Sequence, residues 1–107
     1  MAFTRYHKVV GSDNPNVELL APGDNAGNIN SIMITNIHAT ADATVTLFIE
    51  DDPSSGTTRK YHIIHTIAVP ADSSLFLDNP NMFRFGREFG LYITVGSSDT
   101  VDVIVSQ

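Results

Sequence analysis

The sequence predicts an all-β protein: an antiparallel β-sandwich, jelly-roll-like, built from about eight short strands. Three observations lead to this fold class. Segments of alternating apolar and polar residues recur along the chain, clusters of Gly, Pro, Asn, Asp and Ser separate them, and no segment has a convincing helical period. An immunoglobulin-like sandwich has the same local pattern, but the number of strands favours the jelly roll. With 107 residues, the chain is expected to form a single domain over residues 1–107.

The first predicted strand covers residues 3–10, FTRYHKVV. Neither of its faces is purely apolar, which is typical of an edge strand or of an arm that docks on a neighbouring subunit. Residues 1–12 are therefore expected to form either an N-terminal arm or an edge strand. Turn residues at 11–16 end this segment, and a short strand is predicted at 17–20.

The clearest hairpin in the sequence is predicted for residues 31–53. Residues 31–38 and 44–51 both alternate, and the second of these segments has one plainly apolar face. Residues 39–42 have little apolar bulk and form the predicted polar turn between the two strands. Pro53, which has no backbone N–H to donate, marks the end of the second strand.

The next strand is predicted over residues 59–69, RKYHIIHTIAV, as one long strand or as two short ones around a bulge. Because both of its faces carry apolar side chains, we expect it to be the most buried strand. A short strand is predicted at 74–78, and residues 91–95 and 101–105 are predicted to form a second hairpin. Residues 79–90 form a long connection before that hairpin.

The charge balance argues against a nucleic-acid partner. Twelve acidic residues stand against six basic ones, giving a formal net charge of −6, whereas phosphate backbones are bound by basic surfaces. No apolar run approaches the roughly 20 residues of a membrane-spanning helix, and the N-terminus has no apolar signal core. The absence of cysteine fits assembly in a reducing cytoplasm. We expect a soluble, unprocessed chain with no membrane partner.

No group of residues forms a catalytic or metal-binding pattern above background. His62 and His65 are three positions apart, so on a regular strand they point to opposite faces and can share a metal ion only if a bulge lies between them. Glu50, Asp51 and Asp52 form an acidic cluster of a kind that can hold calcium. This cluster lacks the ligand spacing and glycine of an EF-hand loop, which favours a solvated strand end. The sequence predicts no enzyme, no catalytic residue, no metal site and no cofactor.

Large apolar side chains gather in the connection at 79–90. The phenylalanines and their neighbours there are Met82, Phe83, Arg84, Phe85, Arg87 and Phe89. Such residues either plug the end of a sandwich or contact another chain. A sugar site normally uses exposed Trp or Tyr, and the chain has no Trp and three Tyr, which disfavours sugar binding. Tyr61 and Tyr92 are the residues that such a site would use.

Three motifs follow one another within residues 31–107: SIMITNIHATADATVTLFIEDD, KYHIIHTIAVPADSSLFLD and FGLYITVGSSDTVDVIVS. Their order resembles that of small β-structured virion proteins of tailed bacteriophages, especially marine phages. The corresponding features are a Tyr-His-Ile strand at 61–64, a Pro-initiated turn and strand at 70–77, and a closing VDVxVS strand at 101–106. The resemblance covers residues 31–107 and does not extend to residues 1–30.

The resemblance implies a non-enzymatic virion structural protein, foremost a capsid decoration (cement) protein that self-associates as a trimer or ring. Its partners would be itself and a major capsid or tail protein, on a virion assembled in the bacterial host cytoplasm. A neck, tail or baseplate component, or a receptor- or glycan-binding sandwich module, is the alternative. The candidate interface residues are Phe3, Arg5, Tyr6, Phe83, Arg84, Phe85, Arg87 and Phe89.

Overall fold

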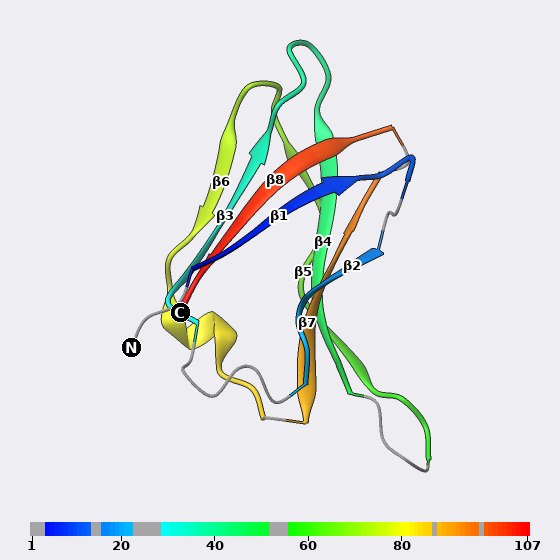
Figure 1. Cartoon of the computed structure of the whole chain (residues 1–107), viewed down its shortest axis with the longest axis vertical. Coiled ribbons are helices and arrows are strands. Elements are labelled where there is room, and N and C mark those ends of the chain that lie inside the picture. The colour runs from blue at the N-terminus through cyan, green and yellow to red at the C-terminus, as the bar shows by residue number, and fades with distance from the viewer. Residues whose placement is uncertain (1–3, 14–15, 23–28, 52–55, 87, 97) are drawn as a thin grey trace.

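A computed structural model of the chain shows two four-stranded antiparallel sheets packed face to face as a sandwich (Figure 1). It describes residues 4–13, 16–22, 29–51, 56–86, 88–96 and 98–107. A short 3-10 turn, η2 (Pro80–Phe83), precedes the seventh strand. The strands are β1 (Thr4–Val10), β2 (Asn16–Leu20), β3 (Ser31–Asn36), β4 (Ala43–Asp51), β5 (Lys60–Val69), β6 (Ser74–Leu77), β7 (Phe89–Val95) and β8 (Thr100–Ser106). The predicted fold class is confirmed.

The order of the strands is that of a jelly roll. The first sheet has the order β1-β8-β3-β6 and the second has the order β2-β7-β4-β5. Of the eight described strands, only β4 and β5 are consecutive in the chain and also hydrogen-bonded to each other. β1 lies at an edge of the first sheet and pairs with β8 along its whole length, which is the edge-strand alternative expected for the N-terminal segment.

Both hairpins expected from the sequence are wrong in their pairing. β3 pairs with β6 and β8 in the first sheet, whereas β4 pairs with β5 and β7 in the second. β7 and β8 likewise belong to different sheets. The alternation of apolar residues determines which side of a strand is buried, but it does not determine which strand lies beside it. The turns predicted inside hairpins are therefore crossings between the two sheets.

A buried asparagine fixes the crossing from β3 to β4. Asn36 is 1% exposed, and its side-chain Nδ2 donates to the carbonyl oxygens of Ala41 at 2.8 Å and of Val69 at 3.0 Å. Its Oδ1 accepts a hydrogen bond from the backbone N–H of His38 at 3.0 Å. One side chain thus joins the end of β3 in the first sheet to the end of β5 in the second, while residues 39–42 form an exposed loop.

The expectation that residues 59–69 form the most buried strand is also wrong. β5 is an edge strand of the second sheet, and most of its residues are exposed. Its pairing with β4 changes register twice, between Val45 and Leu47 and again where Leu47 pairs with Ile64 but Phe48 with His62. Each change places an extra residue on β5, so the segment is one long strand with bulges. An edge strand has a neighbour on only one side, which leaves its apolar side chains less covered.

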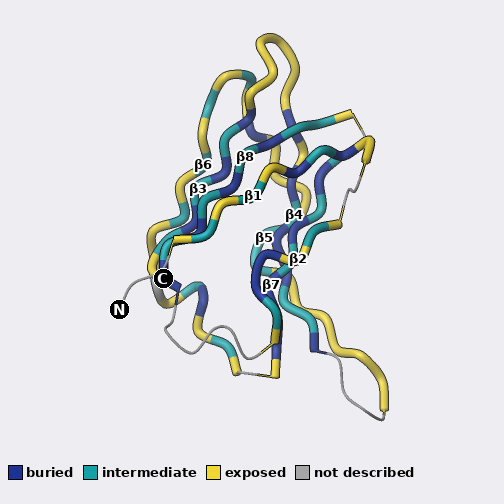
Figure 2. The backbone as a smooth tube through the Cα atoms, in the orientation of Figure 1, coloured by how far each residue is buried: buried dark blue, intermediate teal, exposed yellow. Residues whose placement is uncertain are grey.

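The hydrophobic core lies between the sheets and is built from alternate residues of the strands. Figure 2 shows this alternation along β3 and β8, where buried positions recur at every second residue. Val, Ile and Leu supply almost all of the inward side chains, as expected for β-branched and aliphatic residues in a pleated, half-buried sheet. Side chains with no exposed surface include Val9, Ile32, Ile34, Val45, Leu47, Leu91, Ile93, Val101, Val103 and Val105.

We predict that Asn36→Ala lowers the free energy of unfolding by about 2–4 kcal/mol, because the Val69 carbonyl loses its partner in a buried site and the His38 amide and the Ala41 carbonyl lose theirs at its partly buried edge. Chemical denaturation followed by circular dichroism measures this change. Asn30→Ala, at an exposed position, is the matched control and should cost less than about 0.5 kcal/mol. Equal stability of the two variants would show that the crossing does not depend on the Asn36 side chain.

Candidate functional site

The outer face of the first sheet carries a row of apolar side chains that crosses all four strands. Tyr6 pairs with Ile104, Ile104 with Met33, and Met33 with Phe76. Residues that are paired across antiparallel strands point to the same face, so these four side chains lie side by side. Tyr6 is 74% exposed and Phe76 is 56% exposed. We call Tyr6, Ile104, Met33 and Phe76 the apolar row.

Polar side chains flank the apolar row on both sides. On one side, Lys8 Nζ forms an ion pair with Asp102 Oδ1 at 2.5 Å, and the hydroxyls of Thr35 and Ser74 are hydrogen-bonded at 2.8 Å. On the other side lie three hydroxyl residues in register, Thr4, Ser106 and Ser31. An apolar centre with a polar rim is the usual composition of a protein–protein interface.

The charges on this face cancel. Among the outward residues of β1, β8, β3 and β6, Lys8 is the basic one and Asp102 the acidic one, and the two are paired with each other. The whole chain, by contrast, has a formal charge of −6. Within the four strands, the outer face of the first sheet therefore has no net charge, although the protein is acidic, and the exposed Asp72 and Asp78 lie just before and just after β6.

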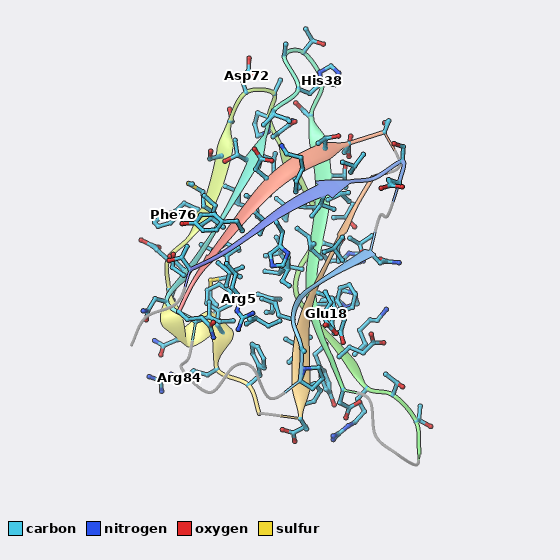
Figure 3. All side chains as sticks on the ribbon, in the orientation of Figure 1. Arg5, Glu18, His38, Asp72, Phe76 and Arg84 are labelled. Carbon is cyan, nitrogen blue, oxygen red and sulfur yellow. The ribbon has the colours of Figure 1, made fainter. Side chains whose placement is uncertain are left out.

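The outer face of the second sheet carries a different row, which is aromatic and acidic. Glu18 pairs with Tyr92, Tyr92 with Phe48, and Phe48 with His62. The Tyr92 hydroxyl donates to Glu18 Oε2 at 3.1 Å. The rings of Phe48 and Tyr92 are stacked, with centroids 5.6 Å apart and planes inclined by 16°. Figure 3 shows Glu18 and Phe76 on opposite sides of the sandwich.

A groove of about 490 Å³ lies over this second row. Its lining combines two ring systems, two carboxylates, one amide and one ammonium group. Lys60 Nζ lies 4.5 Å from the centroid of the Phe48 ring, close enough for a cation–π contact. The Thr94 hydroxyl donates to the side-chain oxygen of Asn16. The lining residues are Asn16, Glu18, Phe48, Glu50, Lys60 and Tyr92, and we call this space the second-sheet groove.

His62 and His65 lie on the same side of β5, because the bulge between them restores a common direction. Their ring centroids are 4.9 Å apart and their planes are nearly perpendicular. The bulge that two histidines at this spacing need in order to share one side of a strand is therefore present. In the described part of the chain, however, no group of three or more His, Cys, Asp or Glu side chains is arranged to hold a metal ion.

The other two histidines, His38 and His7, lie apart from this pair and have contacts within the subunit that explain their positions. His38 Nδ1 accepts hydrogen bonds from the backbone N–H groups of Thr40 and Ala41, both at 3.0 Å, and so shapes the exposed crossing loop. His7 points inward from β1 and its Nε2 is buried without a protein partner. Burial lowers the pKa of His7, so the neutral imidazole is favoured in the folded chain.

Asp51 of the acidic cluster is engaged by a basic residue. Its Oδ1 accepts from the backbone N–H of Arg59 at 2.7 Å, and its Oδ2 accepts from Arg59 Nε at 2.7 Å. The hydrogen bond from the Arg59 amide, and then the Arg59 guanidinium, lower the pKa of the Asp51 carboxyl. This contact joins the end of β4 to the start of β5. Asp52, also named in the cluster, lies outside the described residues.

The structure separates the two candidate interface residues of the N-terminal segment that it describes. Tyr6 faces outward in the apolar row, whereas Arg5 points inward from β1, and Arg5 Nε donates to Gln107 Oε1 at 3.1 Å. Adjacent residues on a strand point to opposite faces, so these two cannot serve one surface. Phe3 lies outside the described residues.

The candidate residues of the connection at 79–90 lie mainly inside the subunit. Phe83 is 3% exposed and Phe89 is 9% exposed, and Phe85 packs against the core from a half-buried position. Arg84 is exposed and projects away from η2 in Figure 3. Phe83 thus occupies the plug position at the end of the sandwich. Arg87 lies outside the described residues.

Ile104, Met33 and Phe76 are not among the candidate site residues named from the sequence, and neither is Glu18 of the second-sheet groove. The sequence signal that could have identified the residues of the apolar row is an apolar side chain at an outward position of an alternating strand. Phe76, which lies between two half-buried leucines, is an example. Several strands each supply one such residue, and only the register shows that they meet.

Comparison with protein-family models, with curated proteins and with solved structures found no match for this chain. Among the described residues, no helix has the length and apolar character needed to cross a membrane. The geometry of the two outer faces therefore supplies the structural basis for assigning a function.

We predict that Asp51 contributes to acid sensitivity. A carboxyl whose pKa is lowered in the folded state stabilises that state above the unfolded pKa, and this contribution is lost as the pH falls through the folded pKa. Unfolding of the wild type between about pH 4 and pH 2 should therefore show a destabilisation that Asp51→Asn lacks. Asp42→Asn, at an exposed loop position, should keep the wild-type profile. Identical profiles for all three proteins would contradict the prediction.

We predict that Phe83→Ala destabilises the isolated subunit by about 3–5 kcal/mol, because it empties a filled position at the end of the core. Arg84→Ala, at the exposed neighbouring position, should change the free energy of unfolding by less than about 0.5 kcal/mol. Denaturant titration of both variants measures the difference. A Phe83→Ala subunit as stable as the wild type, but impaired in assembly, would identify Phe83 as an interface residue.

Proposed function

We propose that this chain is a non-enzymatic structural protein of a tailed bacteriophage virion, a capsid decoration protein that self-associates and binds the particle surface. Two features support the proposal. The motifs of residues 31–107 resemble small virion proteins, and the eight-stranded jelly roll is an architecture that viral capsid domains use. Because one fold serves many functions, the surface carries the argument further.

The apolar row is the observation that carries this proposal. Four side chains in register span the width of the sheet, which is about 14 Å for three strand spacings. Tyr6 and Phe76, at its two ends, are the most exposed large apolar residues of the row. Aromatic residues and Met are enriched in the centres of interfaces, and their burial supplies most of the favourable free energy there.

A second copy of the chain is the occupant that the charges favour. Two subunits that each carry a formal charge of −6 repel one another wherever acidic surfaces meet. The centre of the outer face of the first sheet reduces this cost, because the one lysine and the one aspartate of its strands neutralise each other and the exposed Asp72 and Asp78 lie beyond the ends of β6. Subunits that pack through this face bury apolar area without bringing like charges together.

The surface area of the apolar row alone is smaller than the area that a standard stable interface buries. On a particle that is built from many copies, a small contact area is sufficient, because each subunit is held by several neighbours and the effective concentration of partners on the shell is high. This arrangement suits a decoration protein present in many copies. A neck, tail or baseplate component is the alternative location within the same structural class.

We predict that Tyr6→Glu weakens self-association by at least about tenfold, because it removes a large apolar contact and introduces a charge into the apolar row. Light scattering of the purified protein across a range of concentrations measures the mass of the assembly. Tyr61→Glu is the matched control, since Tyr61 is also exposed (55%) but belongs to the second sheet. Mixing with particles that lack the protein then reports shell binding and copy number.

A wild-type protein that stays monomeric and does not bind particles would contradict the proposed function. An equal loss of assembly in Tyr6→Glu and Tyr61→Glu would show that the outer face of the first sheet is not the interface. Labelling of the bound copies at the neck or tail, with none on the head, would move the protein to the alternative location.

A further inference from the structure

We propose that the second-sheet groove binds a neutral saccharide. The groove lies on the outer face of β2, β7, β4 and β5, on the side of the sandwich opposite the apolar row. Its volume of about 490 Å³ falls within the range of small-molecule sites, roughly 300–1,000 Å³. The inference does not rest on the proposed virion function, because none of its residues belongs to the apolar row.

The lining of the groove has the chemistry that a sugar ring requires. A sugar presents many hydroxyls, each able to donate and accept, beside a small patch of C–H groups. The carboxylates of Glu18 and Glu50 accept hydrogen bonds, the Lys60 ammonium donates them, and Asn16 can do both. The Tyr92 ring offers apolar surface beside these groups, and the buried Phe48 ring is stacked against it from below.

Internal contacts hold several of these side chains in place before a ligand arrives. Glu18 accepts from the Tyr92 hydroxyl at 3.1 Å, which leaves its other oxygen available for a ligand hydroxyl. The Thr94 hydroxyl holds the side-chain oxygen of Asn16, and Lys60 is positioned over the Phe48 ring. All of these residues lie on paired strands. Pre-organised side chains on rigid elements lose less conformational entropy on binding.

The charges of the groove select against anionic ligands. Two carboxylates face one ammonium group, and the chain as a whole is acidic. A phosphate, a uronic acid or a sialic acid would meet net repulsion, because like charges that are brought together without a counter-charge are disfavoured. An uncharged hexose or a neutral oligosaccharide pays no such cost and uses both carboxylates as hydrogen-bond acceptors.

The test uses the full chain, labelled with ¹⁵N and titrated with D-glucose, D-galactose, D-mannose and their neutral oligomers up to about 10 mM. We expect shifts of the amide signals of residues around Glu18, Lys60 and Tyr92 with at least one of these sugars. Glu18→Gln should weaken that binding by about tenfold, because a charge-assisted acceptor becomes a neutral amide. Asp102→Asn, the same change on the opposite face, should leave the affinity unchanged.

Tyr92→Phe separates a positioning role from a direct contact. It removes only the hydroxyl that holds Glu18, so it should weaken sugar binding while Phe48 stays stacked and the unfolding midpoint stays near that of the wild type. The titration is repeated on Tyr6→Glu, so that a failure of assembly and a failure of sugar binding are read separately. No shift with any neutral sugar, shifts confined to the first sheet, equal losses in Glu18→Gln and Asp102→Asn, or preference for acidic sugars would each overturn the proposal.

Discussion

The burial of one side of every strand between the two sheets is the constraint on which the rest of the structure depends. A chain of 107 residues with no disulfides must bury most of its aliphatic side chains in one layer. Period-two alternation meets this requirement in β3, β4, β7 and β8, which lie inside the sheets and have neighbours on both sides. Once the inward positions are fixed, the pairing register also fixes which outward residues stand side by side. The two surface rows are thus consequences of the same register that builds the core.

Alternation explains both what the sequence could predict and what it could not. It located the strands and their buried sides, because each strand carries that signal in its own residues. It did not show that β3 and β4 lie in different sheets, since this depends on contacts such as those of Asn36 with Val69, 33 positions away. The misjudged burial of β5 has a related cause. Ile63, Ile64 and Ile67 suggest a strand covered on both sides, but bulges and an edge position leave much of this strand exposed.

The candidate sites follow the same division between local and long-range information. Tyr6 was named from the sequence because neither face of its strand is purely apolar, which is a local property, but the same reasoning also named Arg5, which points inward. The other members of the apolar row could not, because Met33, Phe76 and Ile104 meet only through the pairing of β3, β6 and β8. Phe83 and Phe89 were recognised as important large side chains, but whether they point into the core or outward depends on where the connection passes over the end of the sandwich. Which outward residues lie side by side therefore depends on the pairing of strands that are far apart in the chain, and a single strand's sequence does not show it.

The jelly roll also separates its two outer faces physically. Stacked sheets lie about 10 Å apart, and the space between them is filled by close-packed aliphatic side chains. Substitutions that are separated by such a distance and share no partners have nearly additive effects. The apolar row on the first sheet can therefore be covered by another subunit without rearranging the acidic, polar groove on the other sheet. An assembly that uses the first face for subunit contacts leaves the second face in solvent. A rigid groove that is repeated over many subunits can then bind a multivalent ligand with high avidity, even where the affinity of each single groove is low.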